Sequence, residues 1–315
     1  MQTERFTQKM SDGAEIAVNR WIPDEEESIK ALVVLSHGML EHSLRYDRVG
    51  SIFAEKGFLL SGHDHRGHGK TAQLAESNGT GCFGKLADKD GFNRVTDDLL
   101  EIVDELKKDY PGKKVILLSH SFGSFVAQNY IEKYGDTVDG AVLIGSSGPM
   151  RIAGVGHAFA SLVCAFFGTS YRSRFIQHTA FANYNAHIKN PESAFDWLCT
   201  NRENLMMYAN DSWCGGTSCA SFFRDMTGGL CQIHRKRSIR EIPKDLPLLF
   251  LYGAEDPVGA YGKSLEKLMA LYASCGVNNA ELRRYEGDRH ELLNEKNSDK
   301  IISDIFDWIE KNVSL

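Results

Sequence analysis

The chain has 315 residues, of which 42% are hydrophobic and 25% are charged, and this is the composition of an ordinary globular protein rather than a disordered one. Its formal net charge is −6. A phosphate backbone therefore finds no long-range attraction, and nucleic-acid binding is disfavoured.

The first 148 residues predict alternating strands and helices. Short apolar runs indicate buried strands, and apolar positions at helical spacing indicate amphipathic helices. In chain order, we predict strands at 4–9, 15–21, 31–35, 58–61, 114–118 and 140–145, and helices at 45–56, 93–108 and 121–133. A Ser-Asp-Gly turn makes the first two strands a hairpin, whereas the later alternation predicts a parallel sheet covered by helices.

The alternation stops between residues 149 and 241, where aromatic, Cys and Met residues gather without a clear strand pattern. It resumes with a strand at 247–252, a helix at 261–273, a strand at 281–285 and a helix at 298–311. We therefore predict one α/β domain with a mostly parallel central sheet flanked by helices. Residues 1–148 and 242–315 form this core, and residues 149–241 form an inserted helical cap.

The N-terminal 13 residues contain no apolar segment of the kind found in signal peptides, and the seven cysteines are an odd number without a Cys-x-x-Cys pair. These features are typical of reduced thiols in a reducing compartment. We expect a cytoplasmic protein without a structural zinc site.

Ser121 occupies a turn that is typical of a catalytic nucleophile. It follows the buried strand at 114–118 and begins the next predicted helix. Such a turn exposes the serine oxygen and needs small residues two positions before and after it, which here are Ser119 and Gly123. A simple helix N-cap is the structural alternative for Ser121.

A serine hydroxyl needs a base to accept its proton and a carboxylate to orient that base. Asp256 and His290 each follow a predicted strand, in the chain order Ser, Asp, His that this fold class uses. The carboxyl ends of neighbouring parallel strands meet at one edge of a sheet. We predict the triad Ser121, His290 and Asp256, with Glu255 and Asp288 as competing acids.

Acyl transfer also needs hydrogen-bond donors for the developing oxyanion. The backbone N–H of Phe122, directly after the nucleophile, is the first predicted donor. The second is the backbone N–H of Met39, in the loop that follows the strand at 31–35, where Gly38 allows the chain to turn its amides inward.

Three motifs together resemble the monoacylglycerol lipases and related bacterial lysophospholipases, which are serine hydrolases of the α/β-hydrolase superfamily. Ser119 and Leu40 depart from the family pattern, which has glycine at these places. The resemblance implies an α/β-hydrolase fold, hydrolysis of a monoacylglycerol or lysophospholipid through an acyl-enzyme, and a cap that forms the acyl tunnel. The motifs are His37-Gly-Met-Leu-Glu-His42 with Arg45-Tyr46, Gly62-His-Asp-His-Arg-Gly-His-Gly69, and His120-Ser121-Phe-Gly123.

We predict substrate contacts from Glu41, His42, Met207 and Trp213. An equal alternative for Glu41 and His42, together with Arg45, is that they brace the oxyanion loop. A cap this rich in apolar residues also predicts transient contact with a membrane surface. Further apolar side chains suited to a channel, or to ordinary helix packing, are Phe159, Phe166, Phe167, Phe175, Phe181, Tyr184, Leu205 and Met206.

Other functions compete with this interpretation. His63, Asp64, His65 and His68 form a cluster that could ligate zinc in a metal-dependent hydrolase, but no further ligand stands at a recognisable spacing, so we expect neither metal nor cofactor. The same triad could cleave short-chain or aryl esters or thioesters. A hydrolase fold can also bind a small lipid or ester without turning it over.

Overall fold

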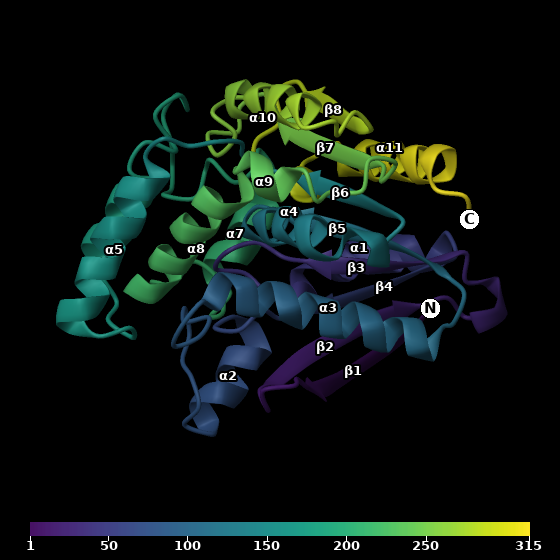
Figure 1. The fold of residues 1–315 in the computed structure, drawn as a ribbon, viewed down its shortest axis with the longest axis horizontal. Helices are drawn as coiled ribbons and strands as arrows, with labels where there is room; N and C mark the ends of the chain where they lie inside the picture. Colours follow the sequence, from purple (N-terminus) through teal and green to yellow (C-terminus); the bar gives the residue numbers. More distant parts are fainter.

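An eight-stranded sheet forms the centre of the protein, whose computed structural model describes residues 1–315 (Figure 1). The strands lie in the order β1-β2-β4-β3-β5-β6-β7-β8. β2 pairs antiparallel with β1 and β4, and all other neighbours are parallel. Their bounds are β1 (Gln2–Lys9), β2 (Glu15–Ile22), β3 (Ala31–Ser36), β4 (Phe58–His63), β5 (Lys114–His120), β6 (Gly140–Ile144), β7 (Leu248–Gly253) and β8 (Ala280–Tyr285).

The central strands are buried on both faces of the sheet. In β3, Leu32 and Val34 belong to one apolar cluster, whereas Val33 and Leu35 belong to another on the opposite face. This is why these strands appear in the sequence as continuous apolar runs instead of alternating patterns. The first cluster is completed by α3 (Gly91–Asp109), α4 (Phe122–Tyr134), α8 (Ala220–Ile233) and α10 (Lys263–Ser274), and the second by α1 (Asp47–Glu55) and α11 (Ser298–Asn312).

Each strand and helix predicted outside residues 149–241 is present, with ends that differ by a few residues. The helix α2 (Gly69–Ser77) was not predicted, because its buried residues are the small Gly69, Thr71 and Ala72, which give no apolar stripe. The remaining elements are α5 (Ala153–Phe167), α6 (Arg174–Phe181), α7 (Arg202–Asn210), α9 (Lys236–Ile239) and the 3-10 helices η1 (Glu26–Ser28), η2 (Ser43–Tyr46), η3 (Gly135–Thr137) and η4 (Leu292–Asn294).

The segment predicted as a cap contacts the core directly through α8. This helix packs against α3 and α4, and its Phe222, Leu230 and Ile233 belong to the apolar cluster of the sheet. α5 packs on α8 from outside and stands at the edge of the molecule (Figure 1). The exact division between core and cap, at residues 149 and 241, stays a prediction.

α5 has apolar residues around its whole circumference, but only one side is covered. Ala153, Ala160 and Cys164 are buried, whereas Phe166 is 80% and Phe167 is 65% exposed. No helix of the protein is both long enough and apolar enough to cross a bilayer.

Candidate active site

Ser121 lies in a strained turn between β5 and α4. Its φ of 52° and ψ of −120° are unusual for a residue with a side chain. A hydrogen bond stabilises this conformation, since the backbone N–H of Ser121 donates to the carbonyl of Ile144 on β6 at 2.9 Å. A Cβ atom at Gly123 would lie 2.0 Å from the carbonyl oxygen of Ser36, so only glycine fits there. This is the backbone geometry of a nucleophile on a strand-to-helix turn.

The family's glycine is replaced by serine at 119 without an unsatisfied polar group. The Ser119 side chain is fully buried, and its hydroxyl donates to the carbonyl of Val142 at 3.0 Å. The other departure, Leu40, adopts a φ of 57°, in the left-handed region that glycine enters more easily. Leu40 therefore adopts a backbone conformation that also accommodates glycine.

His290 and Asp256 form a buried pair behind Ser121. His290 Nδ1 lies 3.0 Å from Asp256 Oδ2, and both residues are almost completely buried. The second carboxylate oxygen accepts the backbone N–H of Val258 at 2.8 Å, which fixes the orientation of the carboxylate. The competing acids are engaged elsewhere, because Glu255 pairs with Arg289 and Asp288 accepts from Asn297.

Ser121 and His290 line the same cavity. The Ser121 hydroxyl and His290 Nε2 are both buried without a hydrogen-bond partner, so Nε2 is free to accept a proton. The imidazole of His290 is packed between two rings, His120 with centroids 4.8 Å apart and Trp197 at 5.0 Å. These contacts restrict the ring without occupying Nε2.

Both predicted oxyanion donors border this cavity. Phe122 is the first residue of α4, where a backbone N–H has no acceptor within the helix. The N–H of Met39 donates to no acceptor in the protein. The residue before it, Gly38, donates its N–H to the carboxylate of Glu41, which holds the loop in shape. The oxyanion role of the two amides stays a prediction.

Glu41 is the centre of a buried ionic network. Its carboxylate accepts from Arg45, from the Tyr46 hydroxyl at 3.0 Å and from His120 Nδ1 at 3.0 Å. Arg45 also donates two hydrogen bonds to Glu291, at 2.7 and 2.8 Å. Burial opposes the ionisation of Glu41, but Arg45 and His120 outweigh it and hold the pKa of that carboxyl well below its usual range.

His120 also belongs to this network. Burial alone would lower the pKa of its imidazole, but the hydrogen bond and negative charge of Glu41 raise it. The Arg45 guanidinium is paired with two carboxylates, those of Glu41 and Glu291. A buried cluster of this kind is stable only when its charges are paired.

The structure does not bring all of the predicted substrate contacts to the cavity. Glu41 borders it, but His42, Met207 and Trp213 are not among its lining residues. Met207 is 64% exposed, since α7 turns Leu205 and Tyr208 inward and leaves Met207 outside. Trp213 lines a neighbouring surface hollow and contacts the ring of His42 edge-on at 5.2 Å.

The cavity has a volume of about 100 Å³, and 15 of its 20 lining residues are hydrophobic. Of the apolar side chains predicted for a channel, only Phe181 and Tyr184 line it. Leu205 is buried in a separate cluster. The channel assignment was wrong for side chains that lie at the surface, namely Phe159, Phe166, Phe167, Phe175, Met206 and Met207.

Several cavity residues were not predicted, because the sequence around them carries no pattern. Trp197 lies in a stretch of turns between α6 and α7, and Phe125 belongs to α4 of the core. Glu291 could have been predicted, since it follows His290 directly and its negative charge is opposite to that of Arg45. The other unpredicted apolar lining residues are Met150, Ala180, Leu198, Tyr208, Phe223, Met226, Leu230 and Val258.

The histidines of the second motif are buried together beside His37, in the loop that follows β3. The rings of His37 and His65 lie 4.3 Å apart, and those of His63 and His65 lie 4.8 Å apart. His65 donates its backbone N–H to His37 Nε2 at 3.0 Å. Burial lowers the pKa of each of these imidazoles, for His63 to about 4. They are neutral packing residues at pH 7.

This burial predicts a loss of stability in mild acid. His63 binds a proton near pH 6.5 when the chain is unfolded but only near pH 4 when it is folded. The free energy of unfolding therefore falls as the pH drops from about 6.5 to 4, by about 3 kcal/mol for this group. Urea unfolding measures this effect. Between pH 6.5 and 4, the free energy of unfolding should fall less for His63→Leu than for the wild type. The control His178→Leu, at an exposed position, should lose as much as the wild type. Identical pH slopes for His63→Leu and the wild type would contradict the assignment.

Comparison with known proteins shows the family to which the chain belongs. A model of the family described as serine aminopeptidase, S33 matches residues 27–297. The chain is 26% identical over 299 residues to the monoacylglycerol lipase of Mycolicibacterium smegmatis, covering 94% of this chain and 93% of that protein. The match to human monoglyceride lipase is 34% identical but spans 117 residues, about a third of each chain.

A solved structure has the same fold over its whole length. The thermostable carboxyl esterase of Bacillus coagulans, in complex with glycerol, aligns with a TM-score of 0.89 over 99% of both chains at 23% identity. The predicted α/β-hydrolase fold and the resemblance to monoacylglycerol lipases are therefore confirmed.

Proposed function

Because the chain belongs to the serine aminopeptidase S33 family and is a hydrolase, we propose that it cleaves the ester of a single acyl chain, a monoacylglycerol or a lysophospholipid, through an acyl-enzyme on Ser121. One observation carries the proposal. Ser121 and His290 line an apolar cavity, and neither the Ser121 hydroxyl nor His290 Nε2 has a hydrogen-bond partner. Asp256 bonds to the other nitrogen of the His290 ring.

The proposed reaction has two steps. His290 Nε2 accepts the proton as Ser121 Oγ attacks the ester carbonyl, and Asp256 stabilises the imidazolium. The amides of Met39 and Phe122 hold the oxyanion, and His290 then returns the proton to the departing alcohol. Water attacks the acyl-enzyme in the same way and releases the fatty acid.

The names of similar proteins support the choice of substrate. The mycobacterial relative is a monoacylglycerol lipase, and the bacillar esterase was solved with glycerol bound. An apolar lining also suits an acyl chain better than a peptide, since it offers few partners for backbone amides.

A short-chain esterase is the second candidate, favoured by the size of the cavity. Its volume of about 100 Å³ is below the roughly 300–1,000 Å³ of pockets that enclose drug-sized ligands. A short acyl group fits this space as it stands. A long acyl chain needs more space than this cavity holds.

A hydrolysis panel separates the candidates. Wild type, Ser121→Ala and the control Ser161→Ala, whose hydroxyl bonds only to its own helix, would be assayed on p-nitrophenyl esters from C2 to C16, on 1- and 2-monoacylglycerols and on lysophosphatidylcholine. A preference for medium or long monoacyl substrates that depends on Ser121 supports the proposal. Activity confined to short or aryl esters selects the second candidate, and no activity in any variant rejects both.

We also propose that the exposed side of α5 contacts membrane surfaces. Phe166 and Phe167 are the side chains that would enter the interface. We expect Phe166→Ser with Phe167→Ser to reduce co-sedimentation with phosphatidylcholine vesicles at least about tenfold, since each ring buries apolar area. Hydrolysis of water-soluble p-nitrophenyl acetate should not change. The control is Phe6→Ser on β1, and equal sedimentation of all variants would reject the contact.

A further inference from the structure

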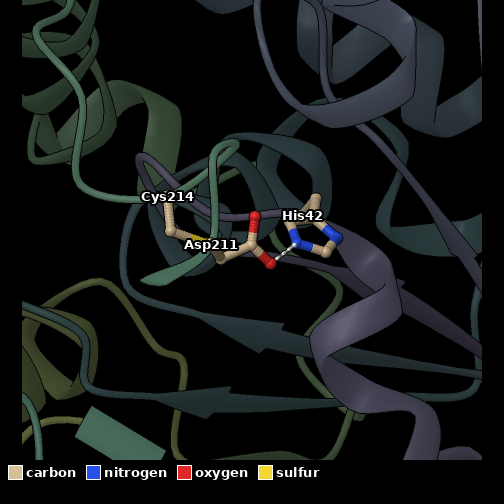
Figure 2. A group of neighbouring side chains, drawn as sticks. All are labelled: His42, Asp211 and Cys214. Atoms are coloured by element: carbon tan, nitrogen blue, oxygen red, sulfur yellow. Dashed lines mark hydrogen bonds and ion pairs between the residues drawn. The ribbon is translucent and has the colours of Figure 1, made fainter. Parts of the chain in front are cut away.

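Three potential metal ligands meet where the loop after β3 touches the loop between α7 and α8. Figure 2 shows His42, Asp211 and Cys214 with their side chains gathered at one point. His42 Nε2 lies 2.9 Å from Asp211 Oδ2, and the three ligand atoms all lie within 4.8 Å of one another. Ligand atoms around a tetrahedral zinc ion are separated by about 3–4 Å, so small side-chain rotations complete the geometry.

The chemistry of the three groups matches one class of ion. Imidazole, carboxylate and thiolate are the ligands that Zn²⁺ takes from proteins. A neutral His42 with the anions of Asp211 and Cys214 balances two positive charges, so the bound ion leaves no net charge in this half-buried place. With three protein ligands, a water molecule would complete the tetrahedron.

The surroundings hold two ligands in place and leave the third free. Asp211 Oδ1 accepts the backbone N–H of Trp213 at 2.8 Å, and the ring of Trp213 packs edge-on against His42. The sulfur of Cys214 has no hydrogen-bond partner in the protein. His42 Nδ1 is also without a partner and can carry the ring proton when Nε2 binds a metal. The Asp211 side chain is 31% exposed, which leaves a route from solvent.

We propose that this cluster binds a divalent transition-metal ion, with Zn²⁺ preferred, through His42 Nε2, an Asp211 oxygen and Cys214 Sγ. The thiol releases its proton to solvent as the metal–sulfur bond forms, and no atom changes oxidation state. The sequence led us to expect no metal because His42 stands 169 positions before Asp211, and no spacing pattern joins residues this far apart.

The site would join the oxyanion loop to the cap segment. The carbonyl of Leu40 already accepts from the Tyr208 hydroxyl at 3.1 Å and from the N–H of Gly215 at 3.2 Å. The His42–Asp211 hydrogen bond is a third connection between the same two segments, and a bound metal would replace it with bonds from one ion to all three side chains. Binding should therefore stabilise the loop that carries Met39, whether or not the chain hydrolyses monoacyl lipids.

Cobalt(II) gives a direct test, because a thiolate ligand produces a near-ultraviolet charge-transfer band. We expect the metal-stripped full chain to bind about one Co²⁺ with this band and with the visible bands of tetrahedral cobalt, to lose both on addition of Zn²⁺, and to melt at a higher temperature with Zn²⁺. Cys214→Ser should abolish the charge-transfer band and weaken Zn²⁺ binding at least about tenfold. Asp211→Asn should weaken binding while keeping the band.

Two cysteine variants distinguish this site from other thiols. Cys231→Ser, on α8, is the matched control and should bind like the wild type. Cys82→Ser removes one of two thiols, Cys82 and Cys219, whose sulfurs lie 3.8 Å apart. A charge-transfer band lost in Cys82→Ser but kept in Cys214→Ser would place the metal elsewhere and overturn the proposal. So would a wild type without the band. All variants would first be checked for a cooperative thermal transition.

Discussion

Ser121→Ala is expected to lower kcat by about 10⁴- to 10⁶-fold, because no other group in the cavity can take the place of the attacking oxygen. Folding should not suffer. The Ser121 hydroxyl is buried without a partner, so its removal leaves no orphaned group, and alanine keeps the same backbone geometry. Burst and steady-state kinetics with a p-nitrophenyl ester, together with urea unfolding, measure the two effects separately.

This result would separate a catalytic serine from a helix N-cap. An N-cap substitution costs about 1 kcal/mol of stability and leaves chemistry intact, and the Ser121 side chain makes no capping hydrogen bond. Near-wild-type turnover in Ser121→Ala, or a large loss of stability with normal turnover per folded molecule, would reject its role as nucleophile.

Asp256→Asn is expected to lower kcat by about 10⁴-fold, since an amide cannot stabilise the imidazolium and favours the wrong tautomer of His290. The matched controls are Asp288→Asn and Glu255→Gln, which remove the same charge from neighbouring residues that make no contact with His290. We expect these two variants to keep turnover within a few fold of the wild type.

Separate values of kcat and KM add a second readout. Asp256→Asn should lower kcat and leave KM nearly unchanged, because Asp256 is buried and does not line the cavity that holds the substrate. Normal turnover in Asp256→Asn, together with loss of turnover in Asp288→Asn, would assign the role of the acid to Asp288 instead.

The core of the fold could be predicted because its strands are buried on both faces and its helices carry long apolar stripes. β5 contains the unbroken apolar run 115–118, and α3 repeats its apolar positions over 19 residues. The grouping of Ser121, Asp256 and His290 could then be predicted from their chain order, because the carboxyl ends of parallel strands meet at one edge of the sheet. Residues 149–241 also support this site, because Trp197 packs on His290 and the carbonyl of Leu198 accepts the backbone N–H of Glu291.

The cap could not be predicted to the same depth. Its helices are apolar on several sides, so hydrophobicity alone did not show which side faces the cavity. Phe181 and Phe167 have the same residue type in the same segment, yet one lines the cavity and the other lies in solvent. The His42, Asp211 and Cys214 cluster arises from tertiary packing of two loops. The sequence left the role of Glu41 open, and its hydrogen bonds to Gly38, Arg45, Tyr46 and His120 favour bracing of the loop, which stays a prediction.

The position of α8 connects the outer helix to the cavity. α8 packs on α3 and α4 and also carries α5, and His157 of α5 lies 2.9 Å through Nδ1 from the carbonyl of Arg224 on α8. Phe223, Met226 and Leu230, all on α8, line the cavity. Because closely packed interiors transmit small displacements, a substitution between α5 and α8 would shift these lining side chains. The shape of the cavity can therefore change through residues that never touch the substrate.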